Sequence, residues 1–133
     1  MTAPAALFIR RFASAVAVLF GCATLAAGIS VLLGRNPGYA VFMPLLVFNT
    51  AMGVVYVAVG LLIWRGARQS VTGAALVALL NTVVLVAVAM AYREAGPIAN
   101  TSIQAMSLRA GVWLALFALL CWSSRKYSAE NAA

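Results

Sequence analysis

The sequence predicts an all-α integral membrane protein, a four-helix bundle with up-down-up-down topology and both termini in the cytoplasm. Hydrophobic residues make up 65% of the 133 residues and charged residues 8%, whereas soluble domains contain about 45–50% and about 25%. The apolar residues form four runs, each near the length of about 20 residues that crosses a hydrocarbon core. Basic residues stand singly or in pairs at or near the ends of these runs.

The first predicted helix covers residues 12–33 of a single transmembrane domain that takes in residues 1–133. Arg10 and Arg11 precede it, and a positive pair before an apolar run also begins a signal peptide. The run continues well past Cys22, which favours a retained helix over a cleaved one. Small or hydroxyl residues recur at Ser14, Ala17, Gly21, Thr24 and Gly28. Their steps of three and four are typical of a close-packed seam between helices in lipid, so a homo-oligomer is a possible partner arrangement.

The second predicted helix covers residues 40–64, after a turn at residues 34–38 that is rich in glycine and contains a proline. A stripe of polar and small residues runs along one face of this helix, because its members are spaced by four, three and four residues. The stripe consists of Asn49, Gly53, Tyr56 and Gly60. An amide, a phenol and two glycines on one face indicate contact with other helices.

The third predicted helix covers residues 71–92, and Asn81 is its only strongly polar interior residue. Asn49 is expected at a comparable depth, so a contact between the two amides is geometrically possible. Two interpretations stay open. The asparagines hold helices together through hydrogen bonds, which contribute about 0.6 kcal/mol on average in lipid, or both line a polar cavity.

The fourth predicted helix covers residues 103–124, with Ser102 as its expected cap. It follows the longest polar stretch of the chain, residues 92–109, in which a Gly-Pro pair breaks the third helix. Residues 1–9 and 127–133 are expected to be short tails outside the bundle.

The distribution of basic residues predicts the orientation of the bundle in a bacterial cytoplasmic (inner) membrane. One side receives Arg10, Arg11, Arg65, Arg68, Arg125 and Lys126, and the other receives Arg35, Arg93 and Arg109. The richer side is expected to face the cytoplasm, which places residues 92–109 in the periplasm. Membrane lipids are the expected partners of these charges. No patch of interleaved basic and aromatic residues indicates binding to nucleic acid.

The absence of His and Asp from the sequence excludes several functions for this chain alone. These are histidine-ligated haem, a His-built zinc site and a Ser-His-Asp triad, and neither a metal nor a cofactor is expected. Cys22 and Cys121 are expected at different depths, too far apart for a disulfide. Both are expected to be small apolar packing residues.

The only constellation with possible chemistry lies around Glu94 and Arg109. An arginine within a span is costly and usually faces the bundle interior with a partner. Two alternatives stay open: a structural ion pair that closes the loop over the bundle, or a site for a ligand or lipid head group. The candidate ligand-binding residues are Arg109, Glu94, Asn49, Tyr56, Asn81, Tyr92, Gln104 and Trp113. One carboxylate and one arginine make neither an acid–base pair nor an activated nucleophile, so no catalytic residue is assigned.

Several of these residues resemble a group of small four-span bacterial inner-membrane proteins of unassigned function. The matching residues are Phe48, Asn49, Gly53, Tyr56, Gly60, Ala105–Arg109 and Trp113. The overall layout is also similar to DoxX-like proteins, but no catalytic motif of that group occurs here. The expected function is a non-enzymatic accessory or a lipid- or small-ligand-binding bundle with a polar site at the periplasmic side. The alternatives are a quinone-handling subunit of a membrane redox complex and a small transporter.

Overall fold

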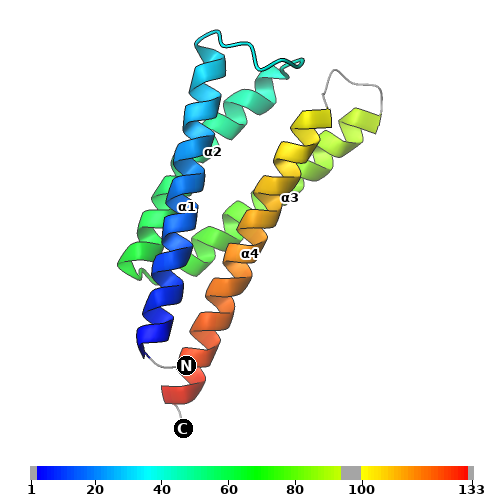
Figure 1. Ribbon diagram of the computed structural model, residues 1–133. Coiled ribbons are helices and arrows are strands. Elements are labelled where there is room, and N and C mark those ends of the chain that lie inside the picture. The colour runs from blue at the N-terminus through cyan, green and yellow to red at the C-terminus, as the bar shows by residue number, and fades with distance from the viewer. Residues whose placement is uncertain (1–2, 94–99, 132–133) are drawn as a thin grey trace.

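The structure, a computed structural model of the chain, describes residues 3–93 and 100–131. Four helices make up nearly all of these residues, and no strand occurs in either described segment. The helices are α1 (Ala3–Leu32), α2 (Met43–Arg65), α3 (Ser70–Arg93) and α4 (Asn100–Asn131). The start of α1 and the end of α4 lie at the same end of the molecule (Figure 1). The predicted all-α fold class is confirmed.

Each of the four helices is long and apolar enough to cross a membrane. Between 22% and 33% of the residues in their most apolar windows are buried inside the chain, and many large apolar side chains are exposed on its outside. Leu19, Leu79 and Leu108, for example, are 69%, 61% and 61% exposed. Helices with satisfied backbones and an apolar exterior are the structures that a lipid bilayer stabilises, so the fold fits a small polytopic membrane protein.

The outer boundaries of α1 and α4 differ from the sequence prediction. α1 begins at Ala3 and α4 extends from Asn100 to Asn131, so parts of both predicted tails are helical. Ser102 therefore lies inside α4, and its predicted role as the cap is wrong. The reason is that hydropathy marks only the lipid-facing part of a helix, whereas Ala, Arg, Lys and Glu continue a helix into water.

Glycines in the left-handed conformation end α1 and α2. Gly34 has a φ of 98° and Gly66 a φ of 68°. Their N–H groups donate hydrogen bonds to the carbonyl oxygens of Val31 and Ile63, and both N···O distances are 3.0 Å. A residue just past a helix end commonly makes such a bond. Pro44 lies in the first turn of α2, where its missing N–H leaves no hydrogen bond unmade.

The helices contact one another in a ring, in which α1 packs mainly against α2 and α3 mainly against α4. The two pairs meet through smaller contacts, and the α2–α3 contact is the smallest of the four. The bundle therefore consists of two closely packed hairpins, and side chains between the hairpins decide how they are held together.

The closest contact joins small-residue faces of α1 and α2. A Cβ atom added at Gly21 would lie 2.9 Å from Val57 N and 3.0 Å from Gly53 O. The Ser14 hydroxyl donates a 2.7 Å hydrogen bond to the Gly60 carbonyl oxygen. The seam predicted on α1 thus packs against two members of the stripe predicted on α2. Because α2 covers this seam within the chain, the seam no longer supports a homo-oligomer.

The two cysteines are free, as the sequence predicts. Cys22 is exposed and Cys121 is partly buried. The predicted packing role of Cys22 is wrong, because the neighbouring Gly21 faces α2 and consecutive helical residues point about 100° apart.

Candidate functional site

A cluster of polar and aromatic residues occupies the centre of the bundle. Tyr56 of α2, Asn81 of α3 and Trp113 of α4 are each 0% exposed. The Tyr56 hydroxyl donates a 2.7 Å hydrogen bond to Asn81 Oδ1, and Asn81 Nδ2 donates a 3.0 Å bond to the Val77 carbonyl. The Tyr56 ring centroid lies 5.0 Å from that of Trp113 and 5.9 Å from that of Phe20 on α1. This central cluster therefore joins all four helices through closely packed side chains.

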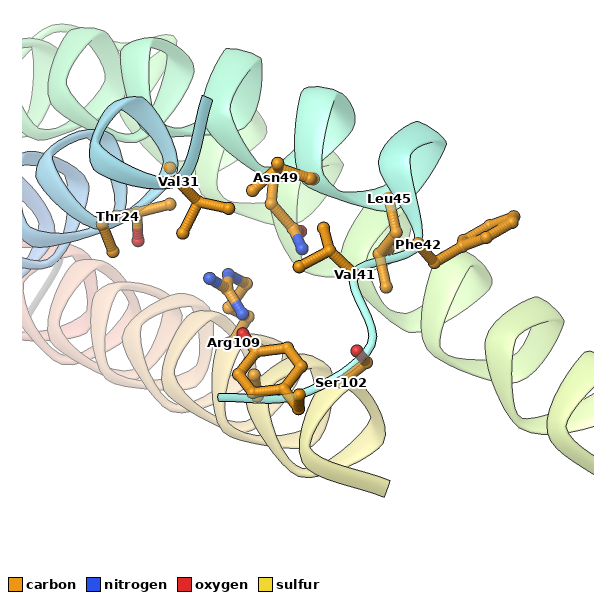
Figure 2. A pocket seen from close by; sticks show the side chains of 13 residues that line it. Thr24, Val31, Val41, Phe42, Leu45, Asn49, Ser102 and Arg109 are labelled. Atoms are coloured by element: carbon orange, nitrogen blue, oxygen red, sulfur yellow. The ribbon is translucent and has the colours of Figure 1, made fainter. Parts of the chain in front are cut away.

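A partly open cavity of about 100 Å³ lies nearer to one end of the bundle. It is bounded by α1, the segment before α2, the first half of α2 and the start of α4 (Figure 2). The polar residues that line it are Thr24, Tyr39, Asn49, Ser102 and Arg109. The remaining lining is mostly aliphatic, with Val31, Val41 and Leu45 among its members (Figure 2). The cavity thus places a few polar groups on an apolar wall, which is the usual composition of a small-molecule site.

Arg109 and Asn49 point into this cavity toward one another, one from α4 and the other from α2 (Figure 2). Arg109 Nε and Asn49 Oδ1 are both buried, and neither has a hydrogen-bond partner among the described residues. Leaving a buried polar group unpaired costs about 1–3 kcal/mol, and more for a charged group. Native proteins rarely contain such groups without a functional or structural reason. The two atoms therefore identify the cavity as a site suited to a polar guest.

The packing of α4 explains why Arg109 faces inward. Met106 and Trp113 are 0% exposed and Ala110 is 3% exposed. Met106 and Trp113 lie three and four positions from Arg109 and share its side of the helix, and Ala110 flanks that side. Burial of this apolar face against the other helices leaves Arg109 pointing into the bundle and not toward lipid.

The structure divides the predicted site residues into three groups. Arg109 and Asn49 line the cavity, whereas Tyr56, Asn81 and Trp113 belong to the central cluster. Tyr92 and Gln104 are exposed and do not line the cavity. Glu94 lies outside the described residues, so its expected pairing with Arg109 stays a prediction.

Asn49 and Asn81 have different environments, although the sequence placed them at comparable depths. The acceptor oxygen of Asn81 is used by Tyr56 and not by Asn49. Counted from the turn that joins α2 to α3, Asn81 is close in depth to Tyr56. Asn49 lies seven residues farther from that turn than Tyr56 does, a difference of about two turns of helix. The helix-joining interpretation therefore describes Asn81, and the cavity interpretation describes Asn49.

Three polar lining residues were missed as site candidates. Ser102 and Arg109 are seven residues apart, which is about two turns on one face, so spacing alone is enough to group them. Thr24 was assigned to the packing seam of α1. Tyr39 precedes α2 in a segment without regular structure. No periodic signal predicts its position, because only the path of the chain brings it to the cavity.

Neither the described residues nor comparisons with known proteins indicate a cofactor or a relative. In the two described segments, no group of three or more His, Cys, Asp or Glu side chains could hold a metal ion. Comparisons with protein-family models, curated proteins and solved structures found no match to this chain. The resemblance to DoxX-like proteins therefore stays a prediction, and the function is argued from the cavity itself.

Proposed function

We propose that this protein is a non-enzymatic membrane protein that binds the anionic end group of a small amphiphile in the Arg109 cavity. The observation that supports the proposal is the pair of buried, unpartnered atoms, Arg109 Nε and Asn49 Oδ1. A guanidinium is a planar donor that matches the oxygens of a carboxylate or phosphate. Asn49 Oδ1 accepts a hydrogen bond, so the preferred end group also carries an O–H or N–H.

The size and lining of the cavity support an amphiphile as the ligand. A volume of about 100 Å³ is somewhat smaller than an apolar cavity of about 150 Å³ that holds benzene. It accommodates a head group but not a large cofactor. Val31, Val41 and Leu45 supply apolar surface beside the polar groups. The rest of such a ligand would extend along the apolar exterior of the helices.

We place the protein in the bacterial cytoplasmic membrane with its helices up-down-up-down, both termini in the cytoplasm and the cavity on the periplasmic side. The unequal distribution of basic residues supports this orientation. Two cation–π pairs at the more basic end indicate that this end lies at a membrane–water interface. Arg11 lies 5.1 Å from the Trp64 ring centroid and Lys126 lies 4.8 Å from that of Trp122. Tryptophan beside basic residues is typical of the membrane–water interface.

A binding role fits the cavity better than catalysis or proton-coupled transport. None of the described residues that line the cavity carries a carboxylate, thiol or imidazole to act as a nucleophile or base. The candidate spans found among the described residues contain no carboxylate. A transporter of the small multidrug type usually couples protons through a membrane-embedded carboxylate. A quinone is the alternative ligand, since Arg109 Nε can also donate to a quinone carbonyl.

Native mass spectrometry of the full-length protein released from membranes tests this proposal. The variant Arg109→Gln removes the buried cation. Arg35→Gln is its control, because Arg35 is an exposed cation in the same α1–α2 connection that contributes Tyr39 and Val41 to the cavity. We expect an amphiphilic acid to remain bound to the wild type and the control. Its occupancy should fall about tenfold or more in Arg109→Gln, as expected for loss of a charged hydrogen bond.

Two added probes, dodecanoate and dodecyl phosphate, extend the test to a protein that loses its ligand on purification. Binding of both probes with equal strength by wild type and Arg109→Gln would disprove the proposed site. A quinone that co-purifies with the wild type and is absent from Arg109→Gln would establish the alternative ligand.

A further inference from the structure

We propose a second binding site, at the other end of the bundle, that takes the phosphate group of a phospholipid. The site is a cavity of about 540 Å³ formed by α1, the turn between α2 and α3, the start of α3 and the last part of α4. Its polar lining residues are Arg10, Arg68, Ser70, Ser123 and Ser124. It shares no lining residue with the Arg109 cavity. The inference therefore does not rest on the function proposed above.

Arg10 is the main cationic group of this second cavity. Its Nε is buried and has no hydrogen-bond partner among the described residues. Its guanidinium lies directly against Gly66, where an added Cβ would collide with the Nη1 atom. Gly66 also has a φ of 68°, a conformation that favours glycine. The Arg10 guanidinium thus occupies the space that Gly66 leaves in the turn between α2 and α3. Gly66 is two positions before Arg68 in the sequence.

Ser70 adds a hydroxyl donor to the same cavity. It is 7% exposed, yet it lines the cavity. The side-chain hydrogen bonds of the described residues include none from its hydroxyl. Ser124 differs, because its hydroxyl already donates to carbonyl oxygens of its own helix. Ser70 is also the first residue of α3, where backbone N–H groups and the helix dipole favour an anion.

The charge of the lining selects an anion. Two arginines face the cavity, and the described residues that line it include no acidic side chain. Guanidinium groups bind phosphate oxygens through paired hydrogen bonds, and a serine hydroxyl adds a third donor. A phosphate diester offers two free oxygens to these donors.

The surroundings of the cavity favour a lipid over a free phosphate ion. Ala6, Leu7, Val71 and Leu120 give it an apolar lining beside the polar one. Trp64 and Trp122 flank this end, are 51% and 48% exposed and each contact a basic residue. Such tryptophans mark the depth of lipid head groups. The volume of about 540 Å³ also exceeds what a phosphate ion needs and admits the glycerol that carries it.

The test compares two neighbouring arginines in the full-length, detergent-solubilised protein. Arg10→Gln removes a cation from the cavity, whereas Arg11→Gln removes one from the outer surface beside Trp64. Phosphatidylglycerol retention is measured by native mass spectrometry against diacylglycerol, which has the same acyl chains but no phosphate. We expect about a tenfold loss of phosphatidylglycerol in Arg10→Gln and less than a twofold change in Arg11→Gln. Equal losses in both variants, or equal retention of the two lipids, would overturn the proposal.

Two further measurements keep the test decisive if Arg10→Gln fails to fold. Arg68 is exposed, so Arg68→Gln is expected to fold, and Ser70→Ala changes one small side chain. Both should weaken phosphatidylglycerol retention, whereas Ser30→Ala should not, because Ser30 lies outside this cavity and its hydroxyl bonds to its own helix. Glycerol 3-phosphate is the water-soluble probe. If millimolar glycerol 3-phosphate displaces the lipid from protein that retains Arg10 but not from Arg10→Gln, the phosphate site is supported. Binding of the soluble probe without retention of the lipid would overturn the lipid as the ligand.

Discussion

The Tyr56 hydroxyl of α2 donates a 2.7 Å hydrogen bond to Asn81 Oδ1 of α3, and both side chains are fully buried. The α2–α3 contact is otherwise the smallest in the ring of helices. This bond therefore connects the two hairpins where backbone packing contributes least. Asn81 also bonds to its own helix through Nδ2, so its amide uses both its donor and its acceptor side.

Removing the Tyr56 hydroxyl should destabilise the bundle modestly. We expect Tyr56→Phe to lower the free energy of unfolding by about 0.6 kcal/mol, the average for interhelical hydrogen bonds in membranes, and by no more than about 1.7 kcal/mol, the maximum. Unfolding in mixed micelles measures the change. A double-mutant cycle with Asn81→Leu should show a coupling of similar size. A coupling near zero would contradict a direct contribution from this bond.

The two asparagines should respond to the same substitution with opposite signs. Asn81→Leu breaks a satisfied network and leaves the Tyr56 hydroxyl buried without its partner, so we expect a loss of about 1–3 kcal/mol. Asn49→Leu removes a buried acceptor that has no partner among the described residues. We expect it to raise stability by up to about 1 kcal/mol. The same variant should bind the acidic probes more weakly.

Stability and probe binding of each asparagine variant can be measured on one preparation. If Asn49→Leu destabilises the protein as much as Asn81→Leu does, Asn49 has a structural role and the binding role proposed for it is wrong.

The α1–α2 contact should not tolerate a methyl group at Gly21. A new Cβ would lie 2.9 Å from the backbone nitrogen of Val57, and a backbone atom cannot rotate away. We expect Gly21→Ala to cost about 1–3 kcal/mol, the usual range for overpacking. Gly111 is the matched control, since no atom lies within 4 Å of its added Cβ. Gly111→Ala should be neutral or stabilising by up to about 1 kcal/mol.

Chemical unfolding of the two glycine variants in the same detergent gives the comparison. Equal stability of Gly21→Ala and Gly111→Ala would show that α1 and α2 are not in close backbone contact.

Cysteine labelling tests the proposed orientation. Asn36, between α1 and α2, and Gln69, just before α3, are both exposed. In a Cys22→Ala, Cys121→Ala background, a membrane-impermeant maleimide should label Asn36→Cys from the periplasm. It should label Gln69→Cys only after the membrane is opened. Labelling of both positions from one side would contradict the up-down arrangement of the first three helices.

Composition and spacing predicted the helices because each depends on a sum over many residues. Four long apolar runs predict four spans even if several residues are misjudged. The ends were less predictable, as α1 and α4 show, since the residues that continue a helix into water are not hydrophobic. Small-residue spacing likewise predicted that Gly21 and Gly53 lie in seams. It did not predict that the two seams pack against each other, which removes the argument for an oligomer.

The candidate site was predicted only in part. Arg109 was expected to face inward because a lone cation in a span avoids lipid, and the structure places it on a cavity with Asn49. Tyr56, Asn81 and Trp113 carry the same kind of polar signal but pack against one another. A list of polar residues in apolar helices does not distinguish these two outcomes.

Hydropathy, charge and periodicity were sufficient to establish that the chain forms four apolar helices, and which face of α1 and of α2 is small or polar. The tertiary structure alone decided which partner each polar atom finds: Asn81 bonds to Tyr56, while Asn49 and Arg109 share a cavity. The physical reason is that pairing depends on the rotation and relative height of neighbouring helices. Turns and side-chain packing set these two quantities, and the periodicity within a single helix does not contain them.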